Sequence, residues 1–417
     1  MSQTLKPQTS AALGAGGSRS RVLLGTVLAQ LGLGTVYAWS VLNPALAQRI
    51  SGDRTQTFPI AITFSIMMIS LSVSTLLIGW LQHRFGVRKV LVACGIVLGA
   101  GLIVSAFATN LWMLYIFAGV IVGAADGIGY LLSLTNVLRW YPDKAGAISG
   151  VSVGSYGVPA VILPFIVTPV LGSADNGYAG LTTCFILWAV TVIVLIGGGG
   201  LLLKDAPEIP KDHSHASNEY TIPQMLRRPQ AYLLYFGITA FCFAGLFIIG
   251  HAGDGAIAAD DPSKYLIGTA ITLVSLVGLV NTIGRFFFGW LSDRVRRTLI
   301  VAVALAVLAV FAFVLGLAWL PQPALYIVGF LLFGASFGGC ITIYPTIVGE
   351  FFGKNNQAKN YSVIYQGFAS GALITLIFNI LMAQKIITFG TSLLIGSVFL
   401  AVSAVILFLV RKPAPVE

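Results

Sequence analysis

Long apolar stretches recur along this chain of 417 residues, and most have the length that a helix needs to cross a lipid bilayer. A spanning helix requires about 20 apolar residues. Hydrophobic residues make up 57% of the sequence and charged residues 9%, whereas soluble domains carry about 25% charged residues. The sequence therefore predicts an all-α membrane protein and not a soluble enzyme.

Twelve stretches are predicted to be transmembrane helices. They cover residues 22–46, 57–81, 90–108, 111–138, 145–171, 179–203, 230–253, 264–291, 299–318, 323–349, 361–384 and 388–410. A long polar segment separates six helices from six. The predicted domains are an N-terminal tail over 1–21, a six-helix bundle over 22–203, a central loop over 204–229, a second six-helix bundle over 230–411 and a C-terminal tail over 412–417.

The basic residues are distributed unevenly between the two sides of the predicted membrane. Nineteen of the 24 Lys and Arg residues lie in the two tails and in the loops on the same side, and only four lie in the opposite loops. The positive-inside rule then places both termini in the cytoplasm of a multi-pass protein of the cell (inner) membrane. The net charge of +10 is explained by contact with anionic lipid head groups, so it does not indicate nucleic-acid binding.

Arg285 is the one charged residue between Leu266 and Leu291. A guanidinium inside a membrane costs about 2.5–3.5 kcal/mol on insertion scales, and its planar fork fits a carboxylate with two hydrogen bonds. The residue predicts a transporter for a small carboxylate anion. The alternative is a structural arginine that binds backbone carbonyls or reaches to the membrane edge.

Four candidate site residues form two pairs, each with the four-residue spacing of one helix face. Asn281 precedes Arg285 by four residues, and Tyr130 follows Asp126 by four, so each pair lies on one face. A carboxyl group in apolar surroundings favours its neutral form, which makes Asp126 a candidate proton carrier. Asp126 could instead pair with Arg285 when no substrate is bound, or be a structural acid.

A short basic turn occurs twice at equivalent places, as GWLQHRFGVRK over 79–89 and as GWLSDRVRR over 289–297. Repeated halves are a common transporter plan. The turn resembles the signature loop of the major facilitator superfamily, with His83 where the acid usually stands. Within that superfamily the chain resembles the oxalate/formate antiporter family and is similar to the monocarboxylate transporters, through YAWSVLNP (37–44), NVLRWYPDKAGAISG (136–150), GSYG (154–157), the span around Arg285 and KNYS (359–362).

This resemblance implies a fold of two pseudo-symmetric six-helix bundles and a set of site residues. It implies that Arg285 binds the substrate carboxylate, that Asn281 takes the place of an acid found in the monocarboxylate transporters, and that tyrosines line the cavity. Phe368 stands where the oxalate transporter has a second basic residue, which favours a monocarboxylate. Tyr365 and Phe337 stand where the oxalate transporter has tryptophans, which implies aromatic walls. The implied substrate-binding residues are Arg285, Asn281, Tyr37, Tyr130, Tyr156, Phe337, Tyr365 and Phe368.

The expected function is secondary active transport of a monocarboxylate of the lactate, pyruvate, acetate or formate class, coupled to a proton through Asp126 and His251. His251, beside Asp254, could relay protons at the outer mouth. An oxalate/formate-type anion exchanger and a carboxylate-sensing receptor are the alternatives. No Walker loop occurs, so no ATP drive is expected, and no cofactor, metal site or disulfide framework is expected from the Cys and His spacing. The expected partners are the anion, a proton or counter-anion and the bilayer, with the protein as a monomer.

Overall fold

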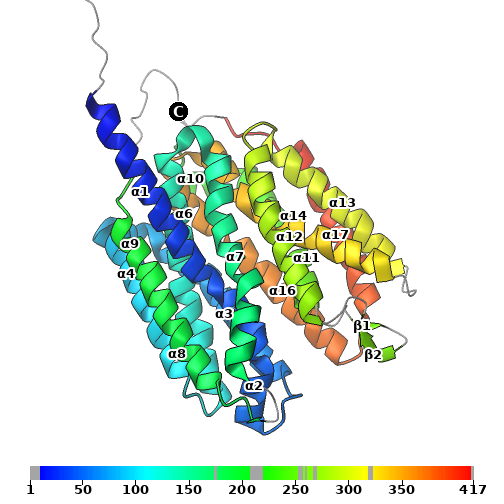
Figure 1. The fold of residues 1–417 in the computed structure, drawn as a ribbon. Coiled ribbons are helices and arrows are strands. Elements are labelled where there is room, and N and C mark those ends of the chain that lie inside the picture. The colour runs from blue at the N-terminus through cyan, green and yellow to red at the C-terminus, as the bar shows by residue number, and fades with distance from the viewer. Residues whose placement is uncertain are drawn as a thin grey trace, which may run out of the picture.

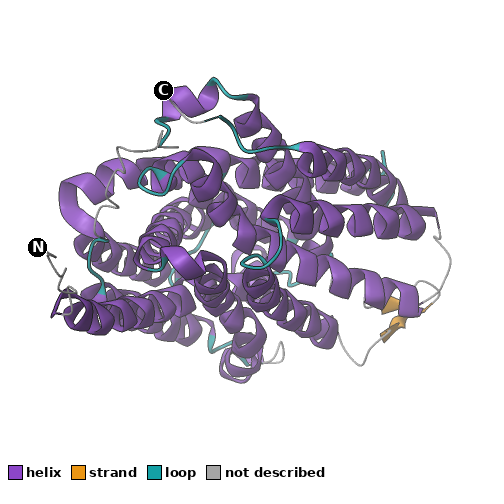
Figure 2. Ribbon diagram, turned by 90° about the horizontal axis from the view of Figure 1, so that it is seen from above, coloured by secondary structure: helices purple, strands orange, loops and turns teal. Residues whose placement is uncertain are grey.

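The computed structural model describes residues 10–172, 176–206, 219–251, 257–258, 261–265, 270–317 and 323–414. Long helices fill it, and both described ends of the chain lie at the same end of the molecule, at the top of Figure 1. We call this end the terminal side. The view along the helices shows them crowded side by side, with two short strands at one edge (Figure 2).

The N-terminal half is built of long helical stretches that follow the order of the predicted spans. Short 3-10 and π turns break several of them. The elements are α1 Ser10–Leu33, η1 Gly34–Ala38, α2 Trp39–Ser51, α3 Phe58–Ser74, η2 Thr75–Leu77, α4 Ile78–Ser105, α5 Leu111–Met113, η3 Leu114–Val122, α6 Gly123–Trp140, η4 Pro142–Lys144, α7 Ala145–Leu171, α8 Leu181–Val192, η6 Ile193–Gly197 and α9 Gly198–Leu202.

The C-terminal half repeats this plan and adds a small hairpin. Its elements are α10 Ile222–Leu226, α11 Pro229–Gly250, β1 Ile257–Ala258, β2 Asp261–Tyr265, α12 Ala270–Leu291, α13 Arg297–Leu317, α14 Pro323–Phe352, α15 Gln357–Ile364, α16 Gln366–Ala383 and α17 Phe389–Leu409. The prediction of a helix from residue 264 was wrong at its start. Residues 261–265 form the strand that pairs antiparallel with β1, and α12 begins at Ala270.

Ten helical stretches in the described part of the chain are long and apolar enough to cross a membrane. One of them, Pro59–Ser105, has 47 residues, more than twice the length that one crossing requires. It reverses at Gly86, whose φ of 77° and ψ of 159° are not helical. Within α12, residues Ser275–Leu291 form a shorter apolar helical stretch. These lengths agree with the predicted order of the spans, and the number of twelve stays a prediction.

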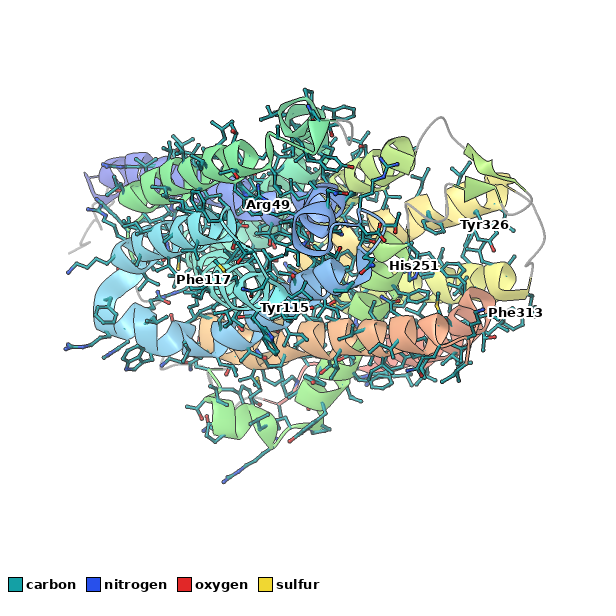
Figure 3. All side chains as sticks on the ribbon, turned by 90° about the horizontal axis from the view of Figure 1, so that it is seen from below. Arg49, Tyr115, Phe117, His251, Phe313 and Tyr326 are labelled. Carbon is teal, nitrogen blue, oxygen red and sulfur yellow. The ribbon has the colours of Figure 1, made fainter. Side chains whose placement is uncertain are left out.

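The perimeter of the bundle is apolar, as a lipid environment requires. Trp112, Phe165 and Trp80 expose 73%, 63% and 62% of their surface. Figure 3 shows the side chains that project from the helices, seen from the side opposite the termini. On that side Arg49 donates to the carbonyl of Ala106 at 2.6 Å and to the hydroxyl of Thr182 at 2.9 Å, so three N-terminal segments are tied together there.

The two halves are in close contact on the terminal side along two seams. In one seam, α7 and α12 meet at glycines, because a Cβ on Gly150 would lie 3.1 Å from the carbonyl oxygen of Arg285. In the other seam, Ser72 on α3 donates to the carbonyl of Tyr365 at 2.9 Å, and Gln366 on α16 donates back to the carbonyl of Ser72 at 2.9 Å. The structure is therefore closed on the terminal side.

The central loop contains more structure than the sequence indicated. The loop was predicted over 204–229, and residues 207–218 lie outside the described residues. The remainder includes α10, which begins with a capping box between Thr221 and Gln224. Tyr220 is fully buried, and its N–H donates to the carbonyl of Phe352 at 3.0 Å. This stretch is thus bound to the C-terminal half.

Candidate functional site

Arg285 lies on α12 where that helix faces α7 and α14, and only 2% of its surface is exposed. Its Nε donates to Oδ1 of Asn281 at 2.9 Å, and its Nη1 donates to the carbonyl of Val153 at 2.7 Å. The amide of Asn281 donates in turn to the carbonyl of Gly334 on α14 at 2.9 Å. The predicted face shared by Asn281 and Arg285 is therefore present, and Asn281 holds the guanidinium in a fixed direction.

No carboxylate in the described part of the chain forms an ion pair with Arg285. The guanidinium carbon instead lies 5.7 Å from the ring centre of Tyr156 and 6.0 Å from that of Tyr37. Cation–π contacts of this kind contribute about 0.5–2 kcal/mol, while removing a charge from water costs several kcal/mol. The site thus contains a buried cation whose charge is neutralised by no acid among the described residues.

Arg285 faces a small cavity of about 10 Å³ that is lined by side chains from both halves. This space corresponds to about one water molecule. The lining residues are Tyr37, Leu71, Tyr130, Tyr156, Arg285, Ile341, Tyr365 and Phe368. Six of these are residues that the sequence singled out, and the structure brings them together.

The aromatic walls of the cavity are in mutual contact. The ring of Tyr156 meets that of Tyr37 at 5.4 Å and that of Tyr130 at 5.0 Å, both edge to face. Across the half boundary, Tyr130 lies 5.9 Å from Tyr365, which stacks on Phe368 at 5.3 Å. The walls therefore combine apolar rings with phenolic hydroxyls, a lining that suits a small organic anion.

Tyr37 and Tyr156 are neighbours because the first span changes from an α-helix to a 3-10 helix just before Tyr37. The 3-10 segment η1 follows α1 at Gly34, and a Cβ on Gly34 would lie 1.9 Å from the carbonyl oxygen of Tyr156. Only glycine permits this approach of η1 to α7. Tyr37, three residues further along η1, is thereby brought against the ring of Tyr156.

Asp126 lies deep in α6 with none of its surface exposed. Its Oδ2 accepts a hydrogen bond from the Tyr156 hydroxyl at 2.7 Å, and its Oδ1 has no hydrogen-bond partner. Among the described residues Asp126 is bonded to Tyr156 and forms no ion pair with Arg285, so the predicted pairing of the acid with Arg285 is not seen in this conformation. Tyr156 thus lies between the acid and the cation.

Two predicted residues lie away from this cavity. Phe337 is buried on α14, but it packs against Gly245 and lies 6.2 Å from the ring of Phe241 on α11, so it does not line the space beside Arg285. His251 follows α11 on the side opposite the termini (Figure 3), where its Nδ1 lies 2.8 Å from the carbonyl of Phe247. Its proposed partner Asp254 is outside the described residues.

The sequence reasoning missed Leu71 and Ile341, which line the cavity, and Val153, whose carbonyl binds Arg285. Apolar side chains and backbone carbonyls have no chemical signature in a membrane sequence. The sequence did contain a signal for the backbone near Val153. Gly150 and Gly154 lie on either side of it, and their four-residue spacing indicates close packing against another helix.

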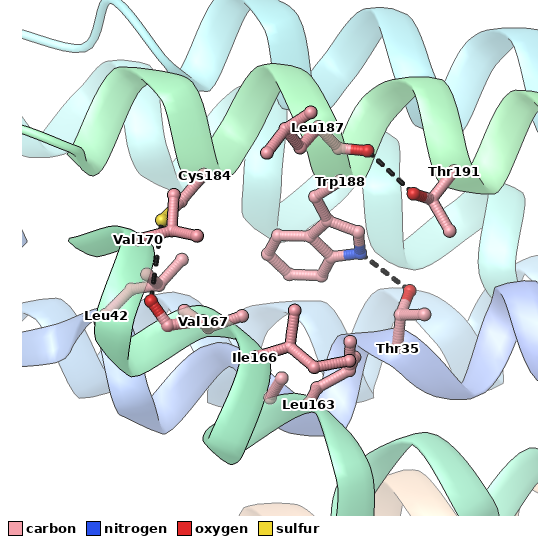
Figure 4. Close-up of a pocket in the computed structure, with 11 residues that line it drawn as sticks. Thr35, Leu42, Leu163, Ile166, Val167, Val170, Cys184, Leu187, Trp188 and Thr191 are labelled. Atoms are coloured by element: carbon pink, nitrogen blue, oxygen red, sulfur yellow. Dashed lines mark hydrogen bonds between the residues drawn. The ribbon is translucent and has the colours of Figure 1, made fainter.

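A second hollow lies between η1, α2, α7 and α8, with a volume of about 90 Å³. Figure 4 shows that its polar groups are already bonded: the Trp188 indole donates to the Thr35 hydroxyl at 2.6 Å, and Thr191 donates to the carbonyl of Leu187 at 2.8 Å. Its other walls are apolar, and no charged residue lines it. This hollow is therefore unsuited to an anion.

Metal and thiol chemistry find no support in the described residues. They contain no group of three or more His, Cys, Asp or Glu side chains that could hold a metal ion. Cys94, Cys184, Cys242 and Cys340 are buried and unbridged. The loop histidines His213 and His215 fall outside the described residues.

Comparison with known proteins agrees with the fold. The sequence profile of the Major Facilitator Superfamily matches residues 23–253 and 256–417. The transporter YhjX of Escherichia coli, an uncharacterized protein of this type, is 36% identical over 85% of this chain and 86% of its own. An oxalate:formate antiporter of Oxalobacter formigenes is 25% identical over 88% of this chain and 85% of its own.

More distant proteins share the architecture. Monocarboxylate transporter 12 of Rattus norvegicus is 23% identical over 65% of this chain and 60% of its own. The structure of the proton:xylose symporter XylE superimposes with a TM-score of 0.74 over 94% of this chain and 96% of that chain, at 13% identity. The profile match, the YhjX similarity and the superposition lead to one assignment: this chain belongs to the Major Facilitator Superfamily of membrane transporters.

Proposed function

We propose that this protein is a secondary active transporter of a small monocarboxylate of the lactate, pyruvate, acetate or formate class. The observation that carries the proposal is Arg285, a buried cation without a carboxylate partner at a cavity walled by both halves. A bound carboxylate would neutralise this charge and accept two parallel hydrogen bonds. Because both halves contribute walls, rocking one half against the other would expose the anion to each side in turn.

The charge of the cavity favours one carboxylate group over two. Arg285 is the one basic side chain among the lining residues, and Phe368 occupies the wall beside it. A second carboxylate buried there would lack a cation, at a cost of several kcal/mol. The names of two relatives, an oxalate:formate antiporter and a monocarboxylate transporter, support a carboxylate substrate without choosing between these cases.

The role of each site residue is part of the proposal. Arg285 binds the carboxylate and Asn281 orients the guanidinium. Tyr37, Tyr130 and Tyr156 orient the anion, while Tyr365 and Phe368 form the apolar wall. Phe337 would support α11 from behind, since it packs away from the cavity. Asp126 is the proposed proton carrier, and His251 would act only at the outer mouth.

The small size of the cavity indicates how transport would proceed. A space of about 10 Å³ holds about one water molecule, so the aromatic walls would have to separate to admit an organic anion. The closed terminal side, with the cytoplasmic termini that the basic loops predict, would make opening on the other side the next step. Energy would come from a proton, with a counter-anion as the alternative source.

The test is uptake of radiolabelled L-lactate, pyruvate, acetate and formate into proteoliposomes, with and without a pH gradient and with and without an internal counter-anion. Arg285→Lys keeps the charge but loses the fork. Truncating one partner of a buried charge pair costs about 2–5 kcal/mol, so we expect a loss of affinity of at least about thirtyfold, and more for Arg285→Ala.

Arg294→Lys is the matched control, because Arg294 is exposed and its guanidinium stacks on Trp290 at 4.0 Å, outside the cavity. Normal affinity in Arg285→Lys would refute the assigned role. Uptake that requires internal oxalate or formate and ignores the pH gradient would make the protein an exchanger. Failure to move any of these acids would favour a sensing receptor.

Selectivity gives a second test. Phe368→Lys places a second cation in the wall, so this variant should gain oxalate or malonate binding and lose affinity for lactate. The measurement is competition by each dicarboxylate against labelled lactate, with Phe337→Lys as a comparison outside the lining. Strong competition by oxalate in the unmodified protein would contradict the argument from a single cation.

A further inference from the structure

Tyr156 contacts both the buried acid and the buried cation. Its hydroxyl donates to Asp126 at 2.7 Å, and the Arg285 guanidinium lies 5.7 Å from the centre of its ring. Its ring also lines the cavity. A change in the cavity can therefore reach Asp126 through a single side chain.

The hydroxyl has one proton to donate, so it can satisfy one acceptor at a time. In the described conformation that acceptor is Oδ2 of Asp126, while Oδ1 accepts no hydrogen bond from the described residues. Asp126 thus has a single hydrogen-bond donor in a site with no solvent exposure. A buried carboxylate that loses its last donor is costly, and such a group takes up a proton instead.

We propose that Tyr156 is a two-position donor that couples anion binding to protonation of Asp126, an inference that rests on the proposed carboxylate site. In the described conformation the hydroxyl bonds to Asp126, and a hydrogen bond donated to a carboxylate favours its ionised form. When an anion binds Arg285, the hydroxyl turns to the anion. Asp126 then takes up a proton supplied by the surrounding buffered solution, and Tyr156 keeps its own proton throughout. One proton thus enters with each anion.

In the described part of the chain, the buried charge near Asp126 is Arg285, which lies on the other side of Tyr156. The titratable side chains that face it are Tyr156 on α7, Tyr37 on η1, Cys94 on α4 and Tyr130 on its own helix. The packed helix α3 has no charged residue, and the charged residues of α1, α4 and α15 lie at their terminal-side ends. The hydroxyl of Tyr156 is thus the side-chain donor that the described structure gives to Asp126.

The sign of the pH dependence follows from this scheme. Because the anion-bound form holds one more proton than the empty form, affinity for the anion rises as pH falls, by up to tenfold per pH unit while Asp126 titrates. Asp126→Asn resembles the protonated form, so its affinity should lose this slope and exceed that of the unmodified protein at high pH. Tyr156→Phe should also lose the slope, and it should bind about tenfold more weakly at low pH because it lacks a hydrogen bond to the anion.

The experiment measures binding of labelled L-lactate to detergent-purified protein between pH 5 and 9, together with proton uptake from weakly buffered solution on lactate addition. Tyr130→Phe is the matched control: it removes a phenolic hydroxyl from the same cavity but leaves the bond between Tyr156 and Asp126. It should retain the pH slope. We expect uptake of about one proton per lactate in the unmodified protein and none in Asp126→Asn.

Infrared difference spectroscopy supplies a readout that is taken first on the unmodified protein. Adding lactate to the unmodified protein should produce a protonated-carboxyl band, and Asp126→Asn should lack it. Lactate binding without proton uptake, without that band and without pH dependence would overturn the coupling and leave the transport function intact. A normal slope in Tyr156→Phe would also overturn it. Failure of the unmodified protein to bind lactate, pyruvate, acetate or formate at any pH would instead refute the proposed function.

Discussion

The two copies of the basic turn connect to the opposite half in different ways. In the C-terminal copy, the carboxylate of Asp293 accepts the backbone N–H groups of Gly146 and Ala147, both at 2.8 Å. These are free amides of the first turn of α7, where a negative charge is favoured. In the N-terminal copy, the corresponding residue is His83, which is exposed, and Gly79 is covered by the side chain of Lys359.

A different acid binds the backbone amides that precede α15. Glu219 in the central loop accepts the N–H groups of Asn355 at 3.1 Å and Asn356 at 3.2 Å, in the turn before α15. Glu219 belongs to the stretch that is already bound to the C-terminal half. Opening the terminal side would therefore break the bonds of Asp293, which cross between halves, and leave those of Glu219 intact. We call Asp293 the latch, because its bonds cross between the halves, and Glu219 the brace, because its bonds stay on the side of the C-terminal half.

The largest effect should come from removing the latch. Asp293→Ala deletes two charge-assisted hydrogen bonds, each contributing about 1.5–3 kcal/mol, so the population open on the terminal side should rise at least about tenfold. Distances between spin labels at the exposed positions Arg84 and Lys354 would measure this. An unchanged distance distribution would show that the glycine seam closes the terminal side without Asp293.

Weakening the bonds of Glu219 should lower thermal stability slightly and leave the open population unchanged. Glu219→Gln keeps the shape but weakens bonds that lie within one half, so the Tm in detergent should fall by roughly 1–3 °C while the spin-label distances stay the same. Glu350→Gln, which breaks the exposed ion pair with Arg297, is a control for loss of one surface charge. A shift of the distances in Glu219→Gln would mean that the brace also holds the halves together.

The smallest effect should come from restoring the missing acid. His83→Asp alone should change the open population by less than about twofold, because Glu219 already occupies the amides before α15 and exposed substitutions change stability by about 0.5 kcal/mol or less. In the Glu219→Gln background, the same substitution should favour closure. An equal effect in both backgrounds would show that His83 and Glu219 act at separate places.

The sequence predicted the spans and most of the cavity, for reasons that differ. Apolar length and flanking polar residues fix a span locally, so helices such as 145–171 match the structure. Arg285 and its tyrosines could be grouped because a charge in an apolar helix is costly and because their motifs resemble a known site. The direction of Phe337 could not be predicted, since it depends on Gly245 of another helix making room for the ring. Neither could Glu219, whose binding partners are backbone amides 136 and 137 residues away.

The three prolines inside α7 have a mechanical consequence. Pro159, Pro164 and Pro169 have no N–H to bond the carbonyl four residues earlier, so the half of α7 beyond Tyr156 bends more easily than an unbroken helix. The half before it is held stiffly by glycine contacts with α12. Elastic strain from a rocking motion would therefore concentrate in the half of α7 that contains the prolines. This half begins three residues beyond Tyr156, the tyrosine that bonds Asp126. Amide hydrogen exchange should be faster there than over residues 146–154.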